Sequence, residues 1–283
     1  MCASFLVEVP FKISLSAIVR SHGWIYLRPW DWNKNCGTLS RPEVSATGRI
    51  AHVGVRQINS KNFLVEVDSN RSEDVRSACR AVKRWLSTNW DPGPAIAVAE
   101  QNNPSVADFI EDGGGRILRG TTFYEDFVKT VCTIQIAWSG TIRMVSDLID
   151  KVGGGVFPTP MQILAFGETG LREKAKLGFR SRTLYHATDR MLASGLIDVR
   201  GNGAEESITY EEMIALYGIG PYAASHLMVL LNDFRRIPVD SEVRSYCREK
   251  LGIEPDQIEP FFARWSDYKF LGYKLHRTIC GLD

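Results

Sequence analysis

The chain has 283 residues, of which 44% are hydrophobic and 24% are charged. A chain of this length and composition folds into one large domain or two smaller ones, so a largely disordered protein is excluded. No apolar run approaches the roughly 18–20 residues that cross a bilayer, which excludes a membrane-spanning helix. The net charge of +1 is weak for a nucleic-acid binder.

Two features indicate where the protein works. The segment from Met1 to Val9 has no basic flank and contains Glu8, so it does not resemble a signal peptide. The cysteines are scattered and no C-x-x-C pair is present, which favours free thiols in a reducing compartment. We therefore expect a cytoplasmic protein that is not secreted and has no contact with a membrane.

Residues 1–95 are predicted to form a β-rich subdomain with one long helix. The predicted strands cover residues 5–9, 24–30, 48–58 and 62–68. The last two read as a hairpin, because Phe63, Val65 and Val67 alternate with other residues at the period of a half-buried strand. Residues 72–89 carry apolar side chains at spacings of three and four and form the predicted helix.

Residues 96–283 read as helical. Helices are expected over residues 105–111, 122–134 and 141–151. Another starts near residue 157, and a further one follows residues 178–182 and runs to 194. The last two cover residues 209–216 and 221–231. Thr122 and Thr209 each precede an acidic residue by three positions, the spacing of a capping box. The predicted fold is therefore α+β and mainly α, with an N-terminal antiparallel β subdomain packed on a helical body.

Residues 209–232 contain the most informative pattern, a helical hairpin with a Gly-x-Gly turn. Gly218 and Gly220 separate the two helical stretches, and Pro221 stands at a favoured first-turn position. The first N–H groups of the second helix would lack partners within that helix, and together with the helix dipole they suit a phosphate oxygen. Glycines also let a phosphate approach the backbone closely. Tight packing of the hairpin alone would explain the same glycines.

An aspartate follows this hairpin at a suggestive distance. Asp240 lies 20 residues after Gly220, within Pro238-Val-Asp240. Hairpin and aspartate together resemble the helix-hairpin-helix (HhH-GPD) DNA glycosylase superfamily, nearest the 3-methyladenine DNA glycosylase II and 8-oxoguanine DNA glycosylase branch. The stretches 123–138, 178–182 and 261–273 resemble further elements of these families, so the likeness covers roughly residues 100–283.

The resemblance assigns roles to particular residues. Asp240 would be catalytic, because a carboxylate stabilises the positive charge that builds on the sugar or deprotonates the attacking water. Asp240 also stands where an aspartate caps the following helix, and we expect the cap's N–H groups to keep its carboxylate ionised. The DNA-binding residues would be Gly218, Gly220, Gln135, Arg180 and Arg182. The last two belong to a basic stretch, residues 172–190, with an excess of four positive charges.

A base inside duplex DNA has to be flipped out before its glycosidic bond can be reached. Tyr222, Trp138 and Trp265 are the predicted base-pocket residues, since aromatic rings stack on an extruded base. Each of these aromatic residues would also fit a plain core position. The implied partner is double-stranded DNA with a modified base, bound by a monomer.

The resemblance also indicates the reaction. Bifunctional relatives carry a lysine where this chain has Tyr222, and a phenol cannot form a Schiff base with the sugar. We therefore predict a monofunctional DNA glycosylase that leaves an abasic site. A glycosylase/AP lyase and a non-catalytic DNA-binding module are the alternatives. The first expectation for the target base is an alkylated purine, and the second is oxidised guanine. A hypermodified base, as in phage DNA, is a further alternative.

No cofactor is expected. Some relatives carry a four-cysteine iron–sulfur cluster after the catalytic segment, but only Cys247 and Cys280 lie in that region here. No metal site is predicted from side chains, and the resemblance leaves room only for a monovalent cation at the hairpin.

Overall fold

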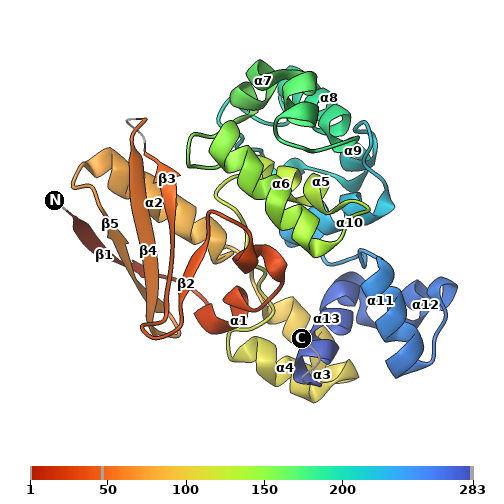
Figure 1. Ribbon diagram of the computed structural model, residues 1–283. Coiled ribbons are helices and arrows are strands. Elements are labelled where there is room, and N and C mark those ends of the chain that lie inside the picture. Colours follow the sequence, from red (N-terminus) through yellow and green to blue (C-terminus); the bar gives the residue numbers. More distant parts are fainter. Residues whose placement is uncertain (1, 46–47, 281–283) are drawn as a thin grey trace.

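A computed structural model describes residues 2–45 and 48–280, and Figure 1 shows a sheet at one end and helices over the rest. The sheet has five antiparallel strands in the order β1-β5-β4-β3-β2. The strands are β1 (Ala3–Glu8), β2 (Asp31–Asn33), β3 (Thr38–Val44), β4 (Ile50–Asn59) and β5 (Asn62–Val67).

The helices account for most of the chain. They are α1 (Leu15–Val19), α2 (Ser72–Trp85), α3 (Gly93–Asn102), α4 (Pro104–Glu111), α5 (Phe123–Thr133), α6 (Trp138–Lys151), α7 (Pro160–Glu173), α8 (Arg180–Ala193), α9 (Tyr210–Ile214), α10 (Pro221–Leu230), α11 (Ser241–Tyr246), α12 (Ile258–Phe262) and α13 (Lys269–Ile279). In Figure 1, α2 lies along the sheet, α5 to α10 form one group of helices, and α11 to α13 form another beside α3 and α4. The predicted α+β, mainly α class is confirmed.

Local sequence signals set several of these elements. The predicted hairpin is β4–β5, where the Asn59 side chain accepts hydrogen bonds from the N–H groups of Lys61 and Asn62, both at 2.9 Å. Thr122 caps α5 by accepting from Glu125 N, and Thr209 forms a full capping box with Glu212. These elements are where the sequence predicted them.

The prediction for residues 24–30 was wrong. They form no strand, and η1 (Gly23–Tyr26) is a short 3-10 helix. Trp24 turns into the core and its indole N–H donates to Asp126 Oδ1 at 3.0 Å, while the Trp30 ring packs edge-on against Trp85. A strand that the sequence did not suggest, β3, occupies the sheet instead, and its inward-facing Arg41 hides the usual apolar alternation.

The predicted subdomain boundary after residue 95 falls inside α3. Helices α3 and α4 pack against the C-terminal segment, α3 on the 3-10 helix η5 (Ala263–Tyr268) and α4 on α13. The boundary stays a prediction, and the packing ties this stretch to the end of the chain.

A buried ionic cluster joins the sheet to the helical body. Helix α5 is buried from Phe123 to Cys132, although it carries three charged side chains. Glu125 accepts two hydrogen bonds of 2.8 Å from Arg41 of β3 and one of 2.6 Å from Lys129. Burial alone would raise the pKa of the Glu125 carboxyl, but Arg41 and Lys129 hold it well below its ordinary value.

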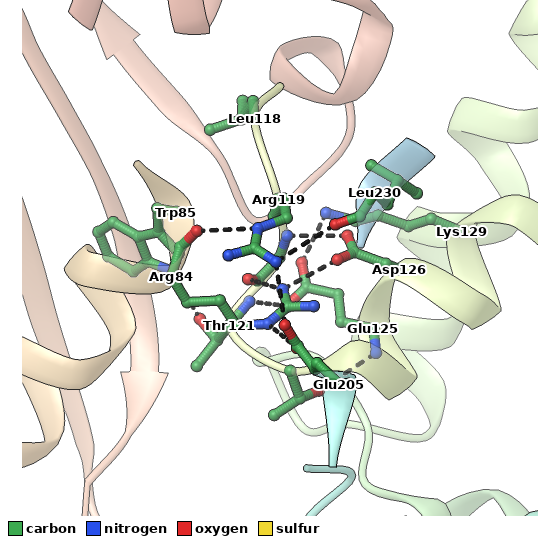
Figure 2. Close-up of polar contacts among 12 residues, drawn as sticks. Arg84, Trp85, Leu118, Arg119, Thr121, Glu125, Asp126, Lys129, Glu205 and Leu230 are labelled. Atoms are coloured by element: carbon green, nitrogen blue, oxygen red, sulfur yellow. Dashed lines mark hydrogen bonds and ion pairs between the residues drawn. The ribbon is translucent and has the colours of Figure 1, made fainter. Parts of the chain in front are cut away.

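Asp126, the next residue on α5, extends this cluster toward α2 and the segment before the hairpin. Arg84 of α2 contacts Asp126 at 2.9 Å and Glu205 at 2.5 Å, and Arg119 contacts Glu205 at 2.9 Å. Figure 2 shows the two guanidinium groups lying together between these carboxylates. Four parts of the chain that are distant in sequence are thereby held at one point: β3, α2, α5 and the segment around residue 205.

The cluster yields a stability prediction. Arg41 keeps its ion pair with Glu43 in Glu125→Gln, but the buried Lys129 loses its carboxylate partner, and leaving a buried charge unpaired costs about 3–5 kcal/mol. Urea unfolding should show a loss of that size. The control is Glu254→Gln, which breaks the exposed pair with Arg248 and should cost less than about 1 kcal/mol. Equal effects of the two substitutions would contradict the role given to the cluster.

Candidate active site

The hairpin of α9 and α10 has the geometry of an anion-binding turn. Gly218 has φ +75°, and a Cβ there would come within 2.2 Å of Thr183 Oγ1, so this glycine lets the turn pack on α8. Gly220 is the N-cap of α10, and a Cβ on it would point into open space. The N-terminus of α10 is therefore accessible to a ligand. Beside it, the exposed Arg182 lies 5.0 Å from the ring of Tyr217.

A cleft of about 920 Å³ opens next to this turn, and we call it the Asp240 cleft. It is lined by the loop 133–136 between α5 and α6, by residues 220–223 at the start of α10, and by side chains from the stretch 239–255, Asp240 among them. The hairpin N-terminus and the aspartate, which the sequence linked only by spacing, thus lie in one cleft.

Asp240 caps α11. Its Oδ1 accepts a 2.8 Å hydrogen bond from Val243 N, as expected from its position in the sequence. The backbone N–H groups favour the charged form of Asp240, as expected, although burial acts in the opposite direction. Burial raises the pKa of the Asp240 carboxyl above its ordinary 3.8, and this effect outweighs the backbone N–H bonds that favour the charged form. A carboxylate whose charge is less well solvated interacts more strongly with a nearby cation.

Tyr222 and Gln135 lie in the same cleft. Tyr222 is half-buried, and burial raises the pKa of its phenol, so the hydroxyl stays protonated at neutral pH and can donate a hydrogen bond. Gln135 is exposed and has φ +49°, a conformation that few residues other than glycine adopt. The loop conformation presents this side chain to solvent at the edge of the cleft.

Arg180 does not lie where the sequence led us to expect. The side chain is only 5% exposed, and its guanidinium donates to the carbonyl oxygens of Ile134 and Gln135. It therefore holds the loop that carries Gln135 rather than facing a phosphate. Of the two arginines predicted to bind DNA, only Arg182 is on the surface.

The two tryptophans predicted for the base pocket do not line the Asp240 cleft. Trp265 is 3% exposed and packs on Gly272, where a Cβ would come within 2.3 Å of the indole, so it is a core residue. Trp138 is 39% exposed and covers Gly23 of the N-terminal part. Tyr222 is the one member of the predicted trio that reaches the cleft.

Behind Tyr222 lies an aromatic cluster that the sequence analysis missed. The His226 ring lies 6.0 Å from the Tyr222 ring, 5.1 Å from Trp24 and 6.2 Å from His22. His22 Nε2 donates to the carbonyl oxygen of Leu118 at 2.7 Å, and none of the residues that the structure describes offers a partner to the enclosed Nδ1 of His226. The signal was available, because His226 stands four residues after Tyr222 and so shares its face of α10.

Burial governs the ionisation of both imidazoles. It lowers the pKa of His226 to about 4, and burial together with the nearby His226 lowers the pKa of His22 well below its ordinary value. Both rings are therefore neutral at physiological pH. The cluster provides Tyr222 with an uncharged, tightly packed support that links α10 to the N-terminal part.

Comparison with solved structures identifies the fold. The 3-methyladenine DNA glycosylase of Archaeoglobus fulgidus superposes with a TM-score of 0.72 at 17% identity, over 96% of this chain and 97% of that one. The 8-oxoguanine glycosylase/lyase of Clostridium acetobutylicum gives 0.68 at 17% identity, over 96% and 95%. The 3-methyladenine DNA glycosylase Mag1 of Schizosaccharomyces pombe, in complex with abasic DNA, gives 0.51 at 18% identity, over 65% and 95%.

The first two of these likenesses cover the β-rich part as well as the helical body. The chain has the fold of the helix-hairpin-helix DNA glycosylases, and the recognition of that fold from the sequence is confirmed. No protein-family profile matches the sequence, and no curated protein sequence does. The shared fold is therefore apparent from the structure, where sequence similarity is too low to show it.

Two further observations bear on cofactors and membranes. Within residues 2–45 and 48–280, no group of three or more His, Cys, Asp or Glu side chains is arranged to hold a metal ion. The expected absence of an iron–sulfur cluster stays a prediction. None of the helices described here is both long and apolar enough to cross a bilayer.

The His226 pKa predicts how stability depends on pH. The ordinary histidine pKa is 6.5 and the folded value is about 4, so the unfolded chain binds the proton more readily. The stabilising contribution is complete above pH 6.5 and is lost as the pH falls toward 4. Between pH 7.5 and pH 5, His226 should account for about 2 kcal/mol of lost unfolding free energy.

Urea unfolding of the wild type and of His226→Gln at the two pH values measures this contribution. The variant should lose less stability on acidification than the wild type. His186→Gln is the matched control, because His186 is 47% exposed. A pH dependence in His226→Gln as steep as in the wild type would show that His226 is not held neutral.

Proposed function

We propose that the protein is a DNA glycosylase that flips a modified base out of duplex DNA and hydrolyses its N-glycosidic bond, leaving an abasic site. The observation that carries the proposal is the Asp240 cleft, which is lined together by the carboxylate that caps α11, the phenol of Tyr222 and the N-terminus of α10 at Gly220. The fold, shared with proteins whose names describe them as DNA glycosylases, agrees with it.

Some residues of the cleft bind the DNA, and others act on the glycosidic bond. The free N–H groups at Gly220 and the dipole of α10 bind a backbone phosphate, with Arg182 adding a charge beside the turn. Gln135, at the tip of the loop, enters the gap left by the flipped nucleotide. The extruded base stacks on Tyr222, and its target sugar comes to lie beside Asp240.

Asp240 then acts on the sugar. As the glycosidic bond breaks, positive charge develops on the deoxyribose, and the carboxylate stabilises that charge while guiding a water to the anomeric carbon. The protein acts as a monomer. Excision assays on duplexes with alkylated, oxidised and hypermodified bases identify the base that it removes.

Asp240→Asn tests the assignment. The amide keeps the shape and can still accept the cap bond from Val243, so lesion binding should be retained. Single-turnover excision should fall by about 10²–10³, the size of a lost electrostatic contribution in catalysis. Glu249→Gln, which removes another carboxylate of the same cleft, should leave the rate within about threefold. A rate in Asp240→Asn within about threefold of wild type would show that the cleft is not catalytic.

A lysine near the hairpin gives the bifunctional alternative a specific form. The sequence offered no lysine close to the hairpin, but the structure brings Lys269 into a second cleft, of about 970 Å³, that Tyr222 also lines. We call it the Lys269 cleft. Lys269 forms an ion pair with Glu259 at 2.9 Å. An amine held in an ion pair is a poor nucleophile, which favours hydrolysis by water.

Borohydride trapping separates the two reactions. The hydrolytic reading predicts no covalent protein–DNA band on a denaturing gel, and strand scission only after hot alkali or an abasic endonuclease. The same trapping experiment with Glu259→Gln is stricter, because the amine of Lys269 has then lost its ion-pair partner. A trapped band in the wild type that disappears in Lys269→Gln would establish a lyase instead.

A further inference from the structure

The Asp240 cleft and the Lys269 cleft adjoin each other. Pro221, Tyr222, Val239 and Arg244 line both of them. Among these four shared residues, only Arg244 is charged. A guanidinium therefore stands where the two clefts meet, on the same short helix that Asp240 caps.

The position of Arg244 is fixed relative to the catalytic carboxylate. Its backbone N–H donates to the carbonyl oxygen of Asp240 at 3.1 Å, the first intrahelical bond of α11. The Asp240 side chain closes the same turn through Val243 N. The backbone of Arg244 is consequently held at a set place beside Asp240, and its side chain extends from there into both clefts.

Arg244 differs from the cations around it because it has no acidic partner among the described residues. Arg235 pairs with Asp233 at 2.6 Å, Lys269 with Glu259 at 2.9 Å and Arg248 with Glu254 at 3.2 Å. The side chain of Arg244 is exposed and unpaired in both clefts. It is thus the cation of this region that remains free for a ligand.

The chemistry of the reaction restricts what that ligand can be. A bare guanidinium close to a sugar that is becoming positive would oppose bond cleavage, so its charge has to be compensated when substrate is bound. A target nucleotide carries a phosphodiester on each side of its sugar. The proposed site at Gly220, the N-terminus of α10, binds only one of the two phosphates. Phosphate oxygens match the fork of an arginine.

We propose that Arg244 binds the phosphodiester that flanks the target nucleotide and is not held by the hairpin, and so positions the sugar over Asp240. Arg244 is a positioning residue, and the inference rests on the proposed function. The neutralised pair no longer repels the developing sugar cation. The strand would then be held on both sides of the flipped nucleotide, at Gly220 and at Arg244.

Binding to a duplex with one tetrahydrofuran site, which needs no excision, provides the first test. Arg244→Ala should weaken binding roughly tenfold and lower the slope of log affinity against log salt by about 1. Arg244→Lys should restore the slope while recovering only part of the affinity, because lysine lacks the fork. Arg248→Ala, which removes a paired arginine of the same cleft, should change neither quantity by more than about twofold.

The second test asks whether the partner is a phosphate. A neutral methylphosphonate replaces the phosphate on the 5′ side or on the 3′ side of the tetrahydrofuran site. At one of the two positions, the methylphosphonate should weaken DNA binding by the wild type but should not weaken binding by Arg244→Ala. If the methylphosphonate weakens binding by Arg244→Ala as much as binding by the wild type at both positions, Arg244 binds another group, such as the base. The inference is then wrong.

Failure of the inference is distinguishable from failure of the proposed function. A wild-type protein that binds the tetrahydrofuran duplex no better than an undamaged one, and excises no base from the panel, contradicts the function. Preferential binding by the wild type that is unchanged in affinity and salt slope by Arg244→Ala overturns only the role of Arg244.

Discussion

The contact between Arg41 of β3 and Glu125 of α5 fixes how the sheet meets the helical body. Charges so deeply buried are tolerated only when each has a partner, and Lys129 completes the set around Glu125. Hydrophobic packing is non-directional, whereas these bonds have defined geometry. The rest of the core is assembled around a helix whose position along the sheet is set by them.

That helix leads directly into the Asp240 cleft. The C-terminal end of α5 continues into the loop 133–136, and the buried Arg180 of α8 holds the loop by two of its carbonyl oxygens. Gly218 brings the hairpin against α8 as well, so loop and hairpin share one support. Two of the segments that line the cleft, the loop and the hairpin, are therefore fastened to α5 or α8, which would suit the proposed holding of a flipped nucleotide against a carboxylate.

The sequence predicted what local chemistry decides. Caps at Thr122, Thr209 and Asp240 and the Gly-x-Gly turn depend on neighbours within a few residues, and these elements were found. The strand β3 was missed because its inward Arg41 is compensated by a residue more than 80 positions away. Likewise, a basic residue in a string of basic residues looks solvated, and only the fold shows that Arg180 is enclosed. Residues that the fold brings into one cleft, Lys269 and Tyr222 for instance, leave no signal in their spacing.

The distribution of charges within the buried cluster has a bearing on how such proteins can be recombined. Arg41, Glu43 and Arg84 come from the part before residue 95, and their partners Glu125, Asp126, Lys129, Arg119 and Glu205 come from the part after it. Neither set is neutral by itself. A sheet taken from a distant relative would leave carboxylates or guanidinium groups uncompensated in the interior, even if its shape fitted well. The two parts are thus matched in buried charge, so a change of charge in one requires a compensating change in the other.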